Sequence, residues 1–235
     1  MRRLGPLYGG AVALVHSTPW RWPGEIADEP RSAGWVVALG LPIGVVAYIA
    51  AAIAHAIGLP VTVAAVAGLG TLALASAGLV EHGLAERIDR ADARSPTVKS
   101  MLALVFVTLA RVAALAAVPV DRWLGVLVAT AVIGRWAAVF LQALGEPILD
   151  DREPRSLVAT PAPLWLSAAV AAGTIAFAVL GLGAKAGVAA LALSAAVAFG
   201  LGLDAQRRDH GLSAPIVACA AAAGELCVLL LATIA

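Results

Sequence analysis

The chain has 235 residues, of which 61% are hydrophobic and only 13% are charged, with a formal net charge of +1 and a mean hydropathy of +0.93. Soluble domains carry roughly a quarter of charged residues, so this composition excludes an ordinary soluble domain. We predict an all-α, polytopic membrane helix bundle that lies in a lipid bilayer as a single domain over residues 1–235, and nothing in the composition indicates nucleic-acid binding.

The first 33 residues are predicted to form a short re-entrant or interfacial segment. Arg2 and Arg3 precede a short apolar stretch, but no small-residue cleavage site follows it, so we expect this segment to stay on the mature chain. The stretch is too short to cross a bilayer, and Trp20 and Trp22 behind it are typical interfacial anchors.

After residue 33, the sequence provides about seven apolar runs that approach the ~20 residues a spanning helix needs. They lie near residues 34–58, 60–80, 100–119, 122–144, 163–183, 186–203 and 212–234. Few flanking charges mark the boundaries of the runs at 60–80 and 186–203.

The distribution of positive charge predicts which loops face the cytoplasm. Twelve of the 16 Lys and Arg residues fall before the first run, in 81–99, in 145–160 and in 204–211, whereas only Arg122 and Lys185 lie in the loops of the opposite side. The positive-inside rule therefore places the N-terminus and the charged loops in the cytoplasm, and seven spans would leave the C-terminus outside. In a bacterium this membrane would be the inner one.

Between the second and third runs lies an acidic and basic segment, residues 81–99. His82, Glu86 and Asp89 are spaced i, i+4 and i+7, which places them on one face of a helix. Carboxylates and imidazole are common ligands of divalent cations, so the stripe predicts a metal site beside the membrane. The alternative is a solvated helix whose charges only keep it out of lipid.

Three charges fall inside predicted spans: Arg111, Arg135 and Glu225. A charge at mid-membrane costs about 2.5–3.5 kcal/mol on insertion scales, and such residues are usually functional. We predict that they are catalytic residues and that the guanidinium groups bind phosphate, to which their planar fork of donors is suited. The alternative is an intramembrane ion pair between Glu225 and one of the arginines.

A denser charged cluster follows the run at 186–203. Arg207, Arg208 and Asp209 are candidates for substrate binding because they could contribute to a phosphate site on the cytoplasmic side. Their charge density alone fits a solvated loop equally well.

The order of these features resembles the cobalamin synthase family, also called adenosylcobinamide-GDP ribazoletransferase. The segment His82-Gly-Leu-Ala-Glu-Arg-Ile-Asp89-Arg90 is similar to the family's Asp-Gly-x-Ala-Asp-x-x-Asp-Gly. Arg111 ends an apolar stretch where members commonly carry lysine, Arg135 falls where the family has an arginine in the next span, and Gly224-Glu225 matches a Gly-Glu in the last helix.

The resemblance implies an enzyme that joins α-ribazole, or its 5'-phosphate, to adenosylcobinamide-GDP with release of GMP in cobalamin biosynthesis. It implies Mg²⁺ as cofactor, with Glu86 and Asp89 as metal ligands and His82 where the family has its first aspartate. Because histidine suits transition metals, Mn²⁺ or another divalent metal is an alternative. The arginines would neutralise charge on the leaving GMP. Homo-oligomerisation is left open.

Three other functions fit the same pattern less completely. A CDP-alcohol-type phosphotransferase also places acidic residues at helical spacing near a cytoplasmic interface. A non-catalytic relative would bind a corrinoid or a partner protein without turnover. In a small-solute transporter, Arg111, Arg135 and Glu225 would line a path instead of a phosphate site.

Overall fold

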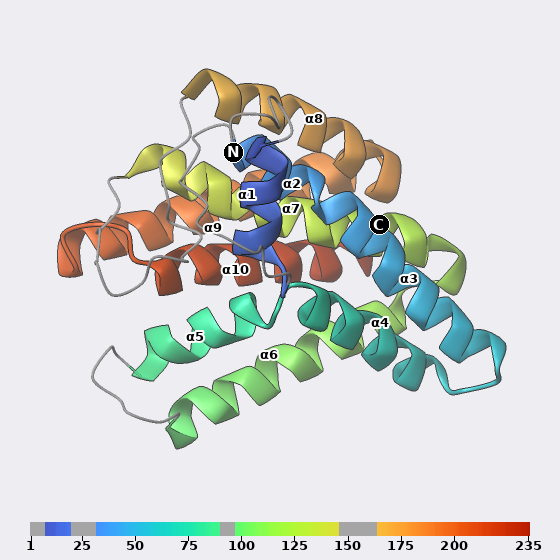
Figure 1. Ribbon diagram of the computed structural model, residues 1–235. Helices are drawn as coiled ribbons and strands as arrows, with labels where there is room; N and C mark the ends of the chain where they lie inside the picture. Colours follow the sequence, from blue (N-terminus) through green and yellow to red (C-terminus); the bar gives the residue numbers. More distant parts are fainter. Residues whose placement is uncertain (1–7, 20–31, 90–96, 146–163) are drawn as a thin grey trace.

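The structure, a computed structural model, describes residues 8–19, 32–89, 97–145 and 164–235. These residues form a bundle of helices without a strand, shown in Figure 1. The helices are α1 (Tyr8–Ser17), α2 (Ser32–Ala38), α3 (Gly40–Ala56), α4 (Val61–Ala75), α5 (Leu79–Asp89), α6 (Val98–Ala117), the short 3-10 turn η2 (Val120–Arg122), α7 (Trp123–Leu144), α8 (Leu164–Leu182), α9 (Ala184–Arg208) and α10 (Ala214–Ala232). The predicted all-α membrane class is confirmed.

Five of the described helices are long and apolar enough to cross a membrane, or six if α4 and α5 together make one broken span. The run predicted at 34–58 corresponds to α2 and α3, which continue into each other as Ser32–Ala56. The run at 163–183 corresponds to α8, Leu164–Leu182. Helices are expected here because lipid offers no partner to a free backbone N–H or C=O group.

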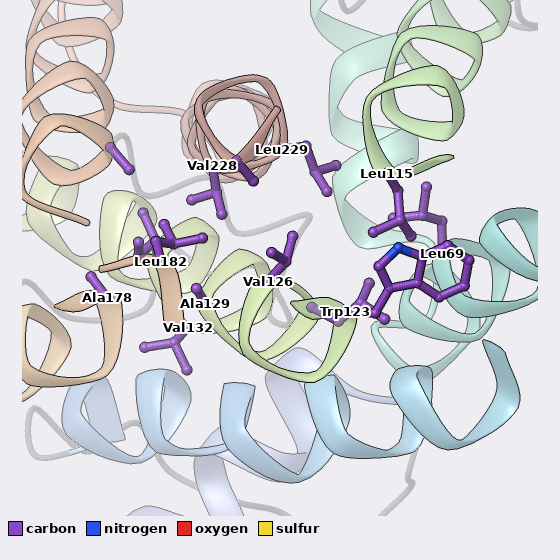
Figure 2. Packing of buried hydrophobic residues seen from close by; sticks show 14 of the residues in the cluster. Leu69, Leu115, Trp123, Val126, Ala129, Val132, Ala178, Leu182, Val228 and Leu229 are labelled. Carbon is purple, nitrogen blue, oxygen red and sulfur yellow. The ribbon is translucent and has the colours of Figure 1, made fainter. Parts of the chain in front are cut away.

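Helices α7 and α10 form the centre of the bundle. The span containing α7 is 78% buried and that of α10 is 67% buried, against 22% for α6. Figure 2 shows Trp123 at the start of α7 beside Leu69 and Leu115. The indole N–H of Trp123 donates to the carbonyl oxygen of Val118 at 3.0 Å, so its polar atom is satisfied inside the core.

The span expected at 60–80 is shorter in the structure and ends in a break. Helix α4 ends at Ala75, and α5 begins at Leu79 with an 80° change of direction. Ala77 and Gly78, between the two helices, have φ angles of 57° and 65°, a left-handed conformation that cannot continue a right-handed helix. As a result α5 packs along α6 and α10 instead of extending α4 (Figure 1).

The described part of the N-terminal segment is α1, which packs against α2. Val12 and Ala13 are almost completely buried, and Gly10 allows the ring of Trp35 to approach closely. Trp20 and Trp22, the predicted interfacial anchors, lie outside the described residues, and the interfacial placement of residues 1–33 stays a prediction.

Small residues hold α3 against α7, and Gly44 provides a test of this packing. A Cβ atom at Gly44 would lie 2.6 Å from Cα of Val128 and 2.9 Å from the carbonyl oxygen of Leu127. We expect Gly44→Ala to lower the free energy of unfolding by about 1–3 kcal/mol, because overpacking forces two helix backbones apart. Unfolding of the purified protein in detergent measures the effect. Gly70→Ala is the control, since no atom lies within 4 Å of its Cβ position; equal losses in both variants would contradict the prediction.

Candidate functional site

Arg111 of α6 lies between two carboxylates that come from different helices. Its Nη1 is 3.0 Å from Oε1 of Glu81 in α5, and its Nη2 is 2.9 Å from Oε2 of Glu225 in α10. The Nη2 atom also donates to the carbonyl oxygen of Ala222 at 3.4 Å. We call Glu81, Arg111 and Glu225 the charged triad. The alternative of an intramembrane ion pair is thus realised in the structure, with Arg111 as the partner of Glu225.

The three side chains of the triad differ in how deeply they are buried. The side chains of Arg111 and Glu225 are only 8% and 2% exposed, whereas that of Glu81 is 27% exposed. Gly134 in α7 makes room for Glu225, because a Cβ atom there would lie 2.5 Å from Cγ of the glutamate. A low-polarity surrounding makes removal of either partner from a buried ion pair expensive.

Arg135 of α7 is buried beside the triad with different partners. Its Nη1 donates to the carbonyl oxygen of Ala131 at 3.1 Å, and its Nη2 donates to Oγ of Ser76 at 2.7 Å. Ser76 lies at the break between α4 and α5, so this bond ties α7 to the break.

A cavity of about 20 Å³ borders Arg135. Its lining consists of Ser17, Val36, Ser76, Leu79, Val80, Arg135, Ala138, Ala221 and Glu225. This volume is enough for about one water molecule, and the charged and hydroxyl groups in the lining could hydrogen-bond to it. The Nε atoms of Arg111 and Arg135 are both buried without a hydrogen-bond partner in the described structure. The Nε–H group of each guanidinium is therefore a donor that no described protein group uses.

The predicted metal-ligand stripe does not come together as one group. Nε2 of His82 is 3.9 Å from Oε2 of Glu86, and the side chain of His82 is 80% exposed. Asp89 instead accepts hydrogen bonds from the backbone N–H of Thr97 at 2.9 Å, from the hydroxyl of Thr97, and from the hydroxyl of Ser100 at 2.6 Å. These bonds fasten the end of α5 to the start of α6.

The carboxyl of Asp89 is accordingly committed to the helix junction. Partial desolvation would raise the pKa of Asp89, but the hydrogen bonds from Ser100 and Thr97 outweigh it and hold this pKa below its ordinary value. Within the described ranges, no three His, Cys, Asp or Glu residues are grouped so that they could hold a metal ion. The described arrangement therefore does not fit a three-ligand Mg²⁺ site, and the metal-binding role of the stripe stays a prediction.

The predicted substrate-binding residues lie at the end of α9, where an ion-pair network joins α9 to α5. Arg87 of α5 contacts Asp209 at 2.6 Å and Asp204 at 3.1 Å. Arg208 contacts Asp204 at 2.7 Å, and Arg207 is exposed. Asp209 and Arg208 are thus partly occupied by partners within the protein, whereas the exposed Arg207 faces outward. Their role in substrate binding stays a prediction.

Glu81, Ser76 and Arg87 are contacts that sequence reasoning did not identify. Glu81 lies one residue before the stripe and therefore on a different face of α5, the face that also buries Ala85. The available signal in the sequence was that Glu81 is four positions from the small residue Ala85 and therefore shares its helix face. Nothing in the sequence showed that this face meets Arg111, because the direction of α5 depends on the break after Ala75.

Comparison with known proteins places the second half of the chain in a family. Residues 98–233 match the sequence model described as cobalamin-5-phosphate synthase. No curated protein and no solved structure matches the chain. The matched range contains Arg111, Arg135 and Glu225 together with the cluster at the end of α9, but it leaves out Glu81 and the predicted metal stripe.

The ion pair between Arg111 and Glu225 leads to a stability prediction. Arg111→Met leaves Glu225 buried without its partner, so we expect the free energy of unfolding to fall by about 3–5 kcal/mol. Adding Glu225→Gln should restore part of this loss, since the uncompensated charge is removed. Unfolding in detergent measures both variants. Arg208→Met is the control. The side chain of Arg208 is 70% exposed, so this change should alter the free energy of unfolding by less than about 1 kcal/mol. A double variant no more stable than Arg111→Met would show that the two residues are not coupled.

Proposed function

Because the chain belongs to the cobalamin-5-phosphate synthase family, we propose that it is a membrane transferase that joins α-ribazole, or its 5'-phosphate, to adenosylcobinamide-GDP and releases GMP. In this reaction a hydroxyl oxygen of the ribazole attacks the cobinamide-linked phosphorus of the diphosphate. The bond from that phosphorus to the oxygen of the departing GMP breaks. Negative charge increases on the leaving phosphate, so the site must supply positive charge in a fixed position.

The observation that carries this proposal is the pair of buried guanidiniums on α6 and α7. Arg111 and Arg135 lie within the residues that match the family, and each keeps a buried Nε donor without a partner. Arginine binds phosphate through planar, paired N–H donors, and it does so more strongly where water is excluded. We propose that the two guanidiniums neutralise the diphosphate and the leaving GMP.

Glu225 is proposed to position Arg111. It is 2% exposed and 2.9 Å from Nη2 of Arg111, so it fixes the guanidinium and offsets its charge when no substrate is bound. The exposed Arg207, with Arg208 and Asp209 beside it, is proposed to contact the nucleotide part of the substrate at the end of α9. Orientation by fixed charges of this kind lowers the cost of assembling two substrates.

Mg²⁺, or Mn²⁺ in view of His82, stays part of the proposal because of the family resemblance. The described positions of His82, Glu86 and Asp89 do not form a site for it. The sidedness is also a proposal: the loops rich in Lys and Arg would face the cytoplasm of the inner membrane, where both substrates would be bound.

One observation favours a second function, transport of a small solute. The break between α4 and α5 bends by 80° next to buried charges, and broken helices beside charged residues are typical of transporter binding sites. Transport and transfer differ in their products, because only a transferase releases GMP.

The transferase is tested by GMP release from purified protein in detergent that is given adenosylcobinamide-GDP, α-ribazole phosphate and Mg²⁺ or Mn²⁺. We expect release that requires the ribazole, and a fall in kcat/KM of about 100-fold or more in Arg135→Lys, because lysine cannot reproduce the paired donors. Asp121→Asn, an exposed change in η2, should behave as the unchanged protein. GMP release that is independent of the ribazole would contradict the transferase; solute uptake into vesicles without GMP release would favour transport.

Glu86→Ala tests the predicted metal stripe separately. If Glu86 holds the metal, the variant should lose the metal-dependent turnover, which is the part of the activity that EDTA abolishes in the unchanged protein. The unfolding midpoint in detergent should stay nearly unchanged, because the side chain of Glu86 is 31% exposed. Full activity in Glu86→Ala, still sensitive to EDTA, would show that the metal is bound elsewhere.

A further inference from the structure

The triad contains one carboxylate more than a simple ion pair needs. Arg111 would be neutralised by Glu225 alone, yet Glu81 contacts the same guanidinium through Nη1 at 3.0 Å. Arg111 is therefore held on both of its terminal nitrogens, and a phosphate can reach those donors only if a carboxylate leaves. The inference below rests on the proposed role of Arg111 as a phosphate-binding residue.

Burial decides which carboxylate is replaceable. Glu225 is 2% exposed and lies between α7 and α10, where Gly134 leaves just enough space for it. Glu81 is 27% exposed, and its second oxygen, Oε2, is buried without a hydrogen-bond partner. An unsatisfied carboxylate oxygen makes the Glu81 contact less favourable than a fully paired one. Glu81 is thus the weaker and more accessible side of the triad.

The attachment of α5 points to the same residue. Helix α5 is separated from α4 by the break at residues 76–78, where the positive φ angles of Ala77 and Gly78 end one helix and let the next begin in another direction. Ser76 in this break accepts a hydrogen bond from Arg135, while Glu81, at the start of α5, contacts Arg111. Arg135 is therefore tied to the break itself, and Arg111 is tied to the first turn of the helix that follows the break.

We propose that Glu81 is a positioning residue that acts as a replaceable counter-ion: it occupies Nη1 of Arg111 in the empty protein and gives up this place to the diphosphate of the substrate. The carboxylate and a phosphate oxygen have the same charge and acceptor geometry, so they compete for the same donor. Glu225 remains on Nη2 and keeps the buried guanidinium oriented during the exchange. The affinity for the diphosphate is therefore lower than it would be without Glu81, because part of the binding free energy is used to displace this carboxylate.

The test is binding of inorganic pyrophosphate to the full chain in detergent, measured by calorimetry without metal or turnover. Glu81→Gln keeps the shape of the side chain and removes its charge, so we expect pyrophosphate to bind about three- to fivefold more tightly, the upper range of a partly exposed ion pair. Glu81→Asp should bind pyrophosphate within about twofold of the unchanged protein, because it keeps the competing charge. Asp121→Asn, which also removes one negative charge but lies exposed in η2, is the matched control and should leave the affinity unchanged.

The outcomes separate this inference from the proposed function. Unchanged or weaker binding in Glu81→Gln, with binding abolished in the double variant Arg111→Met, Glu225→Gln, would overturn the counter-ion role and leave the phosphate role of Arg111 standing. Full binding in the double variant would overturn both. Tighter binding in Asp121→Asn as well would show that the effect is only one of net charge. A merely structural Glu81 would change stability but not the affinity for pyrophosphate.

Discussion

The structure depends on compensating the positive charge of the buried guanidinium of Arg111. A charge inside a bilayer or a dry protein core is costly unless a partner lies within contact distance. Here Glu225 on α10 and Glu81 on α5 supply that partner from two directions. The requirement fixes how three helices meet: α6 must present Arg111, α10 must approach it, and α5 must lie along both. Small residues such as Gly134 permit the approach, and the break after Ala75 turns α5 into position.

The membrane class and the locations of most helices could be predicted from the sequence because hydropathy alone determines which segments avoid water. The break at 76–78 could not, since Ser-Ala-Gly is also common inside membrane helices and only the φ angles of Ala77 and Gly78 show the change of direction. For the same reason the run at 60–80 was expected as one span, whereas its helix ends at Ala75.

For the candidate site, the sequence identified Arg111, Arg135 and Glu225 because charges are rare within apolar runs. The grouping of these residues followed from packing that has no local signature: Glu81 and Arg111 are 30 positions apart. Helical spacing correctly placed His82, Glu86 and Asp89 on one helix, but spacing does not say what the other helices bring to that face. Asp89 is turned to Thr97 and Ser100, which begin the next helix.

The positions of the two carboxylates along the chain have a consequence for biosynthesis. Glu81 is translated 30 residues before Arg111, whereas Glu225 follows only after α7, α8 and α9 have been made. Glu81 is therefore already synthesised when α6 enters the bilayer, so it is available as the first counter-ion of Arg111. The later arrival of α10 then completes the neutralisation, so a nascent chain need not carry an unpaired guanidinium through the lipid while its last helix is still inside the ribosome.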